Sequence, residues 1–96
     1  MMVLITYDVN TETDAGKKRL NKVAKQCQNY GQRVQNSVFE CLIDGARFKQ
    51  MQAALGALID PKKDSLRFYI LGDEWKKNVI HVGAKPGIDL EGTLIT

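Results

Sequence analysis

The order in which two hydrophobic periods follow each other constrains the fold of this chain more than any other feature. Strand-like apolar patterns occupy residues 2–7, 32–44 and 65–71. Apolar residues spaced three and four apart predict amphipathic helices at residues 13–30 and 46–59. The middle strand-like run is long enough for two strands joined by a turn, so the predicted order is β-α-β-β-α-β. That order is typical of the ferredoxin-like sandwich, an α+β fold whose two helices cover one face of an antiparallel sheet.

Glycines mark where the predicted helices end or pack closely. Gly31 follows the apolar stripe of the first helix and predicts a glycine stop just beyond its last turn. Pro61 closes the second helix. Gly56 lies inside that helix, where glycine costs about 1 kcal/mol relative to alanine, so we expect another element to pack closely against it.

The end of the chain and the faces of the strands predict an association between two copies. The 96 residues suffice for one domain, residues 1–96. Short apolar runs at residues 79–82 and 90–95 predict an extra C-terminal strand. The strands carry apolar groups on both faces, whereas two helices cover only one. We therefore expect a sheet-to-sheet homodimer in which residues 79–96 extend the sheet of the partner subunit.

Several classes of protein and site find no support in the sequence. No apolar run approaches the ~20 residues of a membrane span, and the chain starts directly in a strand, so we expect no membrane partner and a cytoplasmic location. Cys27 and Cys41 lack metal-binding or redox spacing and predict core positions. The single histidine, His81, lies between apolar neighbours and is interpreted as structural. Nucleotide-binding glycine motifs are absent from the sequence.

Asp8 is the candidate for chemistry, because it ends the apolar run of the first strand. Two interpretations stay open: a solvated turn residue or helix cap, since residues 8–11 have turn chemistry, or a metal ligand. Mg²⁺, or Mn²⁺ in its place, needs only one or two protein carboxylates when water and phosphate complete its shell. In a dimer, two copies of Asp8 near the two-fold axis would hold one ion and support metal-assisted phosphodiester hydrolysis.

Positive charge is concentrated close behind Asp8. Five of the 14 basic residues lie in the first helix, at Lys17, Lys18, Arg19, Lys22 and Lys25. Cations near a helix start are mildly unfavourable for stability, so the cluster indicates either a phosphate-rich partner or simply a solvated helix face.

Other residues extend this candidate site or have a structural explanation. Arg33 follows the helix and has the planar guanidinium that grips phosphate. Tyr7 and Phe39 either line the site or belong to the core. Trp75, with two lysines after it, is either a nucleic-acid contact or a wedge at the fold edge.

At this point the chain resembles a known family, the small Cas2 proteins of CRISPR adaptation. The matching segments are residues 3–9, 17–20, 31–41, 65–69 and 82–86. They are distributed along nearly the whole chain, and the resemblance is closest to the branch that accompanies subtype I-C systems.

The resemblance implies a fold, an activity and a set of site residues. Members are ferredoxin-like homodimers in which the aspartate ending the first strand, here Asp8, is the Mg²⁺ ligand. Some members are metal-dependent endonucleases on single-stranded RNA or double-stranded DNA, and members form the central dimer of a complex with the Cas1 integrase that inserts spacers. The family's tyrosine, arginine and aromatic positions fall on Tyr7, Arg33 and Phe39, and its basic helix positions fall on residues 17–19.

Two hypotheses of different class follow. The first is a Mg²⁺-dependent endonuclease acting in spacer acquisition. Its catalytic residues are Asp8, Tyr7, Arg33 and Phe39. Its nucleic-acid contacts are Lys17, Lys18, Arg19, Lys22 and Arg33. The second is a non-catalytic DNA-binding scaffold dimer for the Cas1 integrase. A ferredoxin-like domain that binds a small regulatory molecule is a third alternative at the level of the fold.

Overall fold

The computed structural model describes residues 1–83 of the chain. Its helices and strands are β1 (Met2–Asp8), α1 (Asp14–Gln28), β2 (Gln32–Gln35), β3 (Val38–Leu42), α2 (Gly45–Gly56) and β4 (Ser65–Gly72), followed by a short 3-10 helix, η1 (Trp75–Lys77). This order confirms the predicted βαββαβ succession. The strand predicted at residues 90–95 lies outside the described residues.

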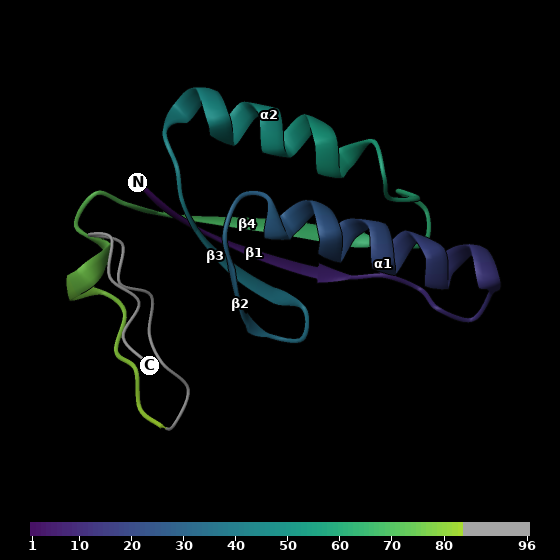
Figure 1. Ribbon diagram of the computed structural model, residues 1–96, viewed down its shortest axis with the longest axis horizontal. Coiled ribbons are helices and arrows are strands. Elements are labelled where there is room, and N and C mark those ends of the chain that lie inside the picture. Colours follow the sequence, from purple (N-terminus) through teal and green to yellow (C-terminus); the bar gives the residue numbers. More distant parts are fainter. Residues whose placement is uncertain (84–96) are drawn as a thin grey trace.

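The four strands form one antiparallel sheet in the order β2-β3-β1-β4, which is the ferredoxin-like arrangement (Figure 1). β1 is central, with Ile5 opposite Phe39 of β3 on one side and opposite Phe68 of β4 on the other. β2 and β4 are therefore the edges of the sheet. Asp8 pairs with Ser65 at one end, and Met2 pairs with Gly72 at the other.

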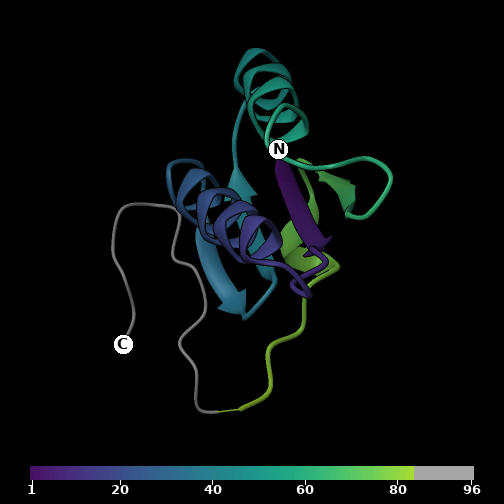
Figure 2. The same ribbon diagram turned by 90° about the vertical axis from the view of Figure 1, so that its right-hand side faces the viewer.

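Both helices lie on the same side of the sheet (Figure 2). The core between them contains Val3 and Ile5 of β1, Val23 of α1 and Met51 of α2, all with no exposed surface. Because successive strand residues point to opposite faces, Leu4, Thr6 and Asp8 lie on the face that the helices leave uncovered. Neither helix in residues 1–83 is long and apolar enough to cross a membrane.

The predicted core role of both cysteines is confirmed. Cys27 and Cys41 are fully buried and carry free thiols. Burial raises the pKa of Cys27 to about 12, reinforced by Cys41 and opposed by Arg33, and raises the pKa of Cys41 to about 11, reinforced by Glu40. Both thiols therefore stay protonated at neutral pH and act as small apolar side chains.

The roles predicted for Gly31 and Gly56 are wrong. α1 ends at Gln28, and Gly31 is not left-handed; a side chain there would collide with the Glu40 carbonyl and the Cys41 sulfur. Gly31 therefore lets the chain pass close to β3 rather than capping the helix. Gly56 is the exposed last residue of α2, and nothing lies within 4 Å of where its β-carbon would be.

The short strand predicted at residues 79–82 is also absent from the structure. This segment follows η1 without joining the sheet, and the side chains of Ile80 and Val82 are 87% and 90% exposed. A strand needs a neighbouring edge that supplies hydrogen bonds, and the apolar alternation alone does not provide one. His81 is consequently exposed rather than packed in a strand, with its Nε2 3.2 Å from the Gly83 carbonyl oxygen.

Candidate functional site

Asp8 is the last residue of β1, and its side chain is exposed on the uncovered face of the sheet. The helix cap that follows is Thr13, whose hydroxyl accepts a hydrogen bond of 3.1 Å from the Gly16 amide. Within residues 1–83 the Asp8 carboxylate makes no hydrogen bond or ion pair. The helix-cap interpretation of Asp8 is therefore wrong, and a solvated carboxylate remains, open to a ligand.

The donor set around Asp8 offers a pair of carboxylates to a divalent ion only if a second copy contributes. The described part of the chain contains no group of three or more acidic, histidine or cysteine side chains placed to hold a metal. Glu40 also lies on the uncovered face, but it pairs with Leu4, four residues along β1, or about 13 Å from Asp8. Burial raises the pKa of Glu40, with His81 opposing this. One chain thus offers one hard oxygen ligand, which suits Mg²⁺ shared between two subunits.

Tyr7 and Phe39 lie together on the helix-covered face. Their rings are stacked with centroids 6.2 Å apart, and the Tyr7 hydroxyl donates a hydrogen bond of 3.2 Å to the Asn36 carbonyl. Phe39 is fully buried and Tyr7 is 6% exposed. Adjacent strand residues point in opposite directions, so Tyr7 and Asp8 of one chain do not line the same pocket. Of the two interpretations, the structure supports the core role for both aromatics.

Arg33 belongs with these aromatics rather than with Asp8. It lies opposite Phe39 across β2 and β3, with its guanidinium carbon 5.2 Å from the centre of the Phe39 ring. Burial raises the pKa of Tyr7, Cys27 raises it further, and Arg33 opposes the shift. The structure therefore brings Tyr7, Arg33 and Phe39 together and separates them from the carboxylate.

The basic cluster of α1 divides into two groups. The side chains of Lys17, Lys18, Lys22 and Lys25 are exposed, and within residues 1–83 none forms an ion pair. Arg19 instead turns into the fold, where its Nε lies 2.8 Å from Oδ2 of Asp64 and its Nη2 3.3 Å from Oδ1. Four lysines therefore face solvent, and Arg19 has a structural partner.

Sequence reasoning missed Asp64, the acid that Arg19 contacts. Its side chain has no exposed surface and also accepts hydrogen bonds from the amides of Asn10 and Asp60, at 3.0 and 2.8 Å. The Arg19 hydrogen bond, helped by these amides and opposed by desolvation, lowers the pKa of Asp64 to about 2. Arg19 and Asp64 are 45 residues apart, and no local pattern links them.

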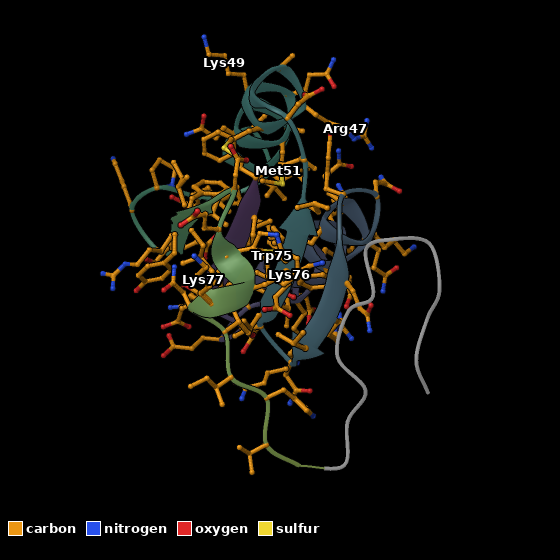
Figure 3. All side chains as sticks on the ribbon, turned by 90° about the vertical axis from the view of Figure 1, so that its left-hand side faces the viewer. Arg47, Lys49, Met51, Trp75, Lys76 and Lys77 are labelled. Carbon is orange, nitrogen blue, oxygen red and sulfur yellow. The ribbon has the colours of Figure 1, made fainter. Side chains whose placement is uncertain are left out.

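The aromatic-basic cluster lies at the other end of the molecule. η1 follows the end of β4 that pairs with Met2, away from Asp8, and its side chains are shown in Figure 3. The Lys76 ammonium lies 5.8 Å from the Trp75 ring centre, and Lys77 lies 3.7 Å from Glu74. Trp75 is half-buried at that end of the sheet, so the cluster is not part of a site with Asp8, and both interpretations of it remain predictions.

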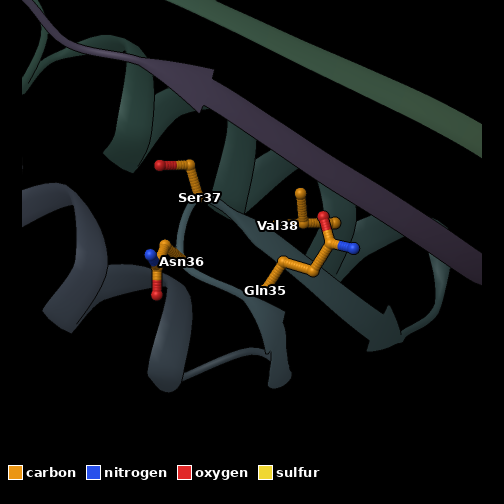
Figure 4. Close-up of a pocket in the computed structure, with 4 residues that line it drawn as sticks. All are labelled: Gln35, Asn36, Ser37 and Val38. Atoms are coloured by element: carbon orange, nitrogen blue, oxygen red, sulfur yellow. The ribbon is translucent and has the colours of Figure 1, made fainter. Parts of the chain in front are cut away.

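A shallow hollow lies at the turn between β2 and β3. It has a volume of about 470 Å³ and is lined by Gln35, Asn36, Ser37 and Val38 (Figure 4). The Ser37 carbonyl accepts a hydrogen bond of 3.1 Å from the Tyr7 amide. The four lining residues include no titratable side chain, so the hollow offers hydrogen bonds but no acid or base.

Comparisons with known proteins identify the family of this chain. The family model described as CRISPR associated protein Cas2 matches residues 1–79. A protein of Chlorobaculum tepidum named CRISPR-associated endoribonuclease Cas2 is 61% identical over 95 residues, covering 99% of each chain. A protein of Halalkalibacterium halodurans named CRISPR-associated endonuclease Cas2 has the same identity and coverage.

Solved structures agree with these sequence matches. The crystal structure of Streptococcus pyogenes Cas2 at pH 6.5 has a TM-score of 0.75 and 59% identity, covering 86% of this chain and all 100% of the other. A hypothetical protein from Thermus thermophilus has a TM-score of 0.69 at 30% identity, covering 86% and 90%. The fold, the exposed aspartate ending β1 and these likenesses lead to one conclusion: the chain belongs to the Cas2 family of CRISPR-associated proteins.

Proposed function

We propose that two copies of this chain form a metal-dependent endonuclease that hydrolyses phosphodiester bonds in double-stranded DNA or single-stranded RNA during CRISPR spacer acquisition. The observation that carries the proposal is Asp8, an exposed carboxylate without a partner in residues 1–83, at the end of the central strand. Relatives of 61% identity bear the names endoribonuclease and endonuclease, which supports a nuclease. We further propose a cytoplasmic location and membership of the subtype I-C branch.

The uncovered face of the sheet supports association of two copies. It presents Leu42 and Tyr69, which are 40% and 42% exposed, and exposed Ile80 and Val82 follow beyond η1. A two-fold contact through this face places the same surface on both subunits, and a two-fold axis near the end of β1 would bring Asp8 of one copy to Asp8 of the other. Residues 79–96 would then pair with the partner's sheet, which gives the apolar alternation of residues 79–82 an edge to join.

Asp8 of each subunit would hold one Mg²⁺ or Mn²⁺ ion, which supplies Lewis-acid polarisation of a phosphodiester. The exposed lysines of α1 attract the phosphate backbone and hold it by point charge, so they contribute to binding of nucleic acid rather than to the choice of sequence. Tyr7, Arg33 and Phe39 act as positioning residues, because they fasten β1 to β3 and to the β2–β3 turn beneath the carboxylate.

Cleavage by Asp8→Asn and by wild type tests the nuclease directly. We expect the variant to lose at least about 100-fold in rate with Mg²⁺, the scale on which a catalytic group contributes, while dimerisation is unchanged. Glu12→Gln is the matched control, because Glu12 is an exposed acid four residues along the chain. Glu12→Gln should cleave at the wild-type rate, and EDTA should stop cleavage by wild type and by Glu12→Gln. Equal cleavage by Asp8→Asn and wild type would overturn the proposal.

One observation favours a second function, a non-catalytic DNA-binding scaffold dimer for the Cas1 integrase. Tyr7 and Phe39 are buried on the face opposite Asp8, so neither aromatic lies beside the carboxylate to assist cleavage. A scaffold needs the exposed lysines and the dimer but not Asp8. In an integration assay with Cas1, wild-type levels of spacer insertion by Asp8→Asn would support the scaffold, and a loss matching its loss of cleavage would support the nuclease.

A further inference from the structure

Residues 60–64, the part of the α2–β4 connection that leads into β4, form a loop with several internal hydrogen bonds. The Asp60 carbonyl accepts from the amides of Lys63 and Asp64, at 3.0 and 2.7 Å. The Asp60 carboxylate accepts from the Lys62 amide at 3.0 Å, and the Asp60 amide donates back to Asp64 at 2.8 Å. The loop is therefore a folded turn with a fixed backbone.

This loop is also fastened to the Asp8 end of the sheet. The buried Asp64 carboxylate joins it to the β1–α1 connection through the Asn10 amide and to α1 through Arg19. Ser65, the residue after Asp64, pairs with Asp8 across β4 and β1. Figure 1 shows the loop, the end of β1 and the start of α1 gathered at the same end of the molecule.

The two lysines of the loop point their charge outward. Lys62 and Lys63 are exposed, and within residues 1–83 neither forms an ion pair. Among the charges of residues 60–64, Arg19 neutralises Asp64, which leaves Lys62 and Lys63 against Asp60 and one positive charge in excess on the loop itself. A fixed backbone reduces the ordering cost of a contact made by these side chains.

We propose that Lys62 and Lys63 form a second phosphate-binding contact for nucleic acid, on the β4 side of Asp8, while the α1 lysines contact the backbone from the helix side. The proposal rests on the nucleic-acid binding in the proposed function and adds two residues to it. β1, which bears Asp8, is then flanked by cations of α1 and of the 60–64 loop. The Asp64–Arg19 pair fastens the loop to α1 and so fixes the distance between these two groups of cations.

The salt dependence of binding tests the proposal. Each lysine that neutralises a phosphate contributes about 0.9 to the slope of log K against log salt on duplex DNA. Lys62→Gln/Lys63→Gln should therefore reduce the slope by roughly two for each subunit that contacts the duplex and weaken binding at least about tenfold at 0.1 M salt. The measurement uses a short duplex in EDTA, so that cleavage plays no part. Both lysines are exposed, so the thermal midpoint should match wild type.

Lys49→Gln is the control, because Lys49 is an exposed lysine that projects outward from α2 (Figure 3). It should leave the slope unchanged. Wild-type affinity and slope in the double variant would overturn this inference alone and leave the proposed function standing. Failure of wild type to bind either duplex DNA or single-stranded RNA, or a flat salt response, would overturn the nucleic-acid binding on which this inference and the proposed function both rest.

Discussion

At the scale of single residues, the Arg19–Asp64 pair decides how the Asp8 end of the sheet is assembled. Asp64 is the only buried acid of residues 1–83. It precedes β4 and, through hydrogen bonds, links this strand to α1 and to the segment between β1 and α1. A carboxylate that accepts four hydrogen bonds without exposure is satisfied only in this arrangement. Arg19 is thus a positioning residue. Of the phosphate contacts predicted for α1, only the four exposed lysines of this helix remain.

Removing the Asp64 charge should make the protein less stable and less sensitive to acid. The pKa of Asp64 is lowered to about 2 from its ordinary 3.8, so its contribution to the free energy of unfolding is complete above pH 4 and is lost as the pH falls toward 2. Asp64→Asn keeps the shape but leaves Arg19 unpaired, and we expect a loss of about 3 kcal/mol at pH 7. Denaturant unfolding at several pH values measures both effects.

Asp44→Asn is the control for that experiment, since Asp44 is an exposed acid whose Oδ1 accepts a single hydrogen bond of 2.8 Å from the Arg47 amide. It should change the stability at pH 7 by less than about 1 kcal/mol. If Asp64→Asn lost stability between pH 4 and 2 as steeply as wild type, the ion pair would not be the source of the acid sensitivity.

The sequence predicted Asp8 as a site residue but grouped it with the wrong neighbours. Tyr7 and Asp8 adjoin in sequence, yet strand alternation sends one side chain into the core and the other to the open face. That separation was present in the sequence as period-two alternation. The Arg19–Asp64 contact was not, because a pair 45 residues apart depends on how α1 packs beside the α2–β4 loop.

At the scale of elements, the hydrophobic periods predicted the helices and strands of residues 1–72 correctly, and errors fell at their ends. α1 and α2 stop at Gln28 and Gly56, earlier than their apolar stripes suggested. Leu58 and Ile59 still pack against the core from an irregular segment, so burial continues where the helix does not. Residues 79–82 show the opposite failure, because a strand pattern forms no strand without an edge to pair with.

Alanine substitutions at Gly56 and Gly31 should change the free energy of unfolding in opposite directions. Gly56→Ala should raise the free energy of unfolding by up to about 1 kcal/mol, because alanine favours the helix and the site is open. Gly31→Ala should lower it by about 1–3 kcal/mol, since the new methyl group collides with β3. Urea unfolding of both variants measures the difference. A stabilising Gly31→Ala would show that this turn is not tightly packed.

At the scale of the whole molecule, the sheet face that the helices leave uncovered is the surface on which a single chain leaves apolar side chains and Asp8 exposed. The helices bury one face of the sheet, while Leu42, Tyr69 and Asp8 remain exposed on the other. One carboxylate per chain suits a shared ion only if two copies meet there. Sequence predicted this from apolar groups on both faces, but the register between two copies depends on surfaces that periodicity does not describe.

A charge on the uncovered face should therefore separate the subunits without unfolding them. Leu42→Lys places an ammonium where two sheets would meet, and we expect a monomer by light scattering at micromolar concentration, because burying an unpaired charge costs several kcal/mol. Ile70→Lys is the matched control. Ile70 is 57% exposed on β4, but it pairs with Val3 and so lies on the helix side of the sheet. This variant should remain a dimer.

The Leu42→Lys variant also tests whether cleavage requires the dimer. If an ion shared by two Asp8 carboxylates drives cleavage, Leu42→Lys should lose Mg²⁺-dependent activity together with dimerisation, although residue 42 lies at the far end of β3 from Asp8. Its thermal midpoint and its far-UV circular dichroism should stay close to wild type, since an exposed lysine fits the folded monomer. A monomeric Leu42→Lys that still cleaved at the wild-type rate would mean that one carboxylate suffices, and the shared-ion site would have to be abandoned.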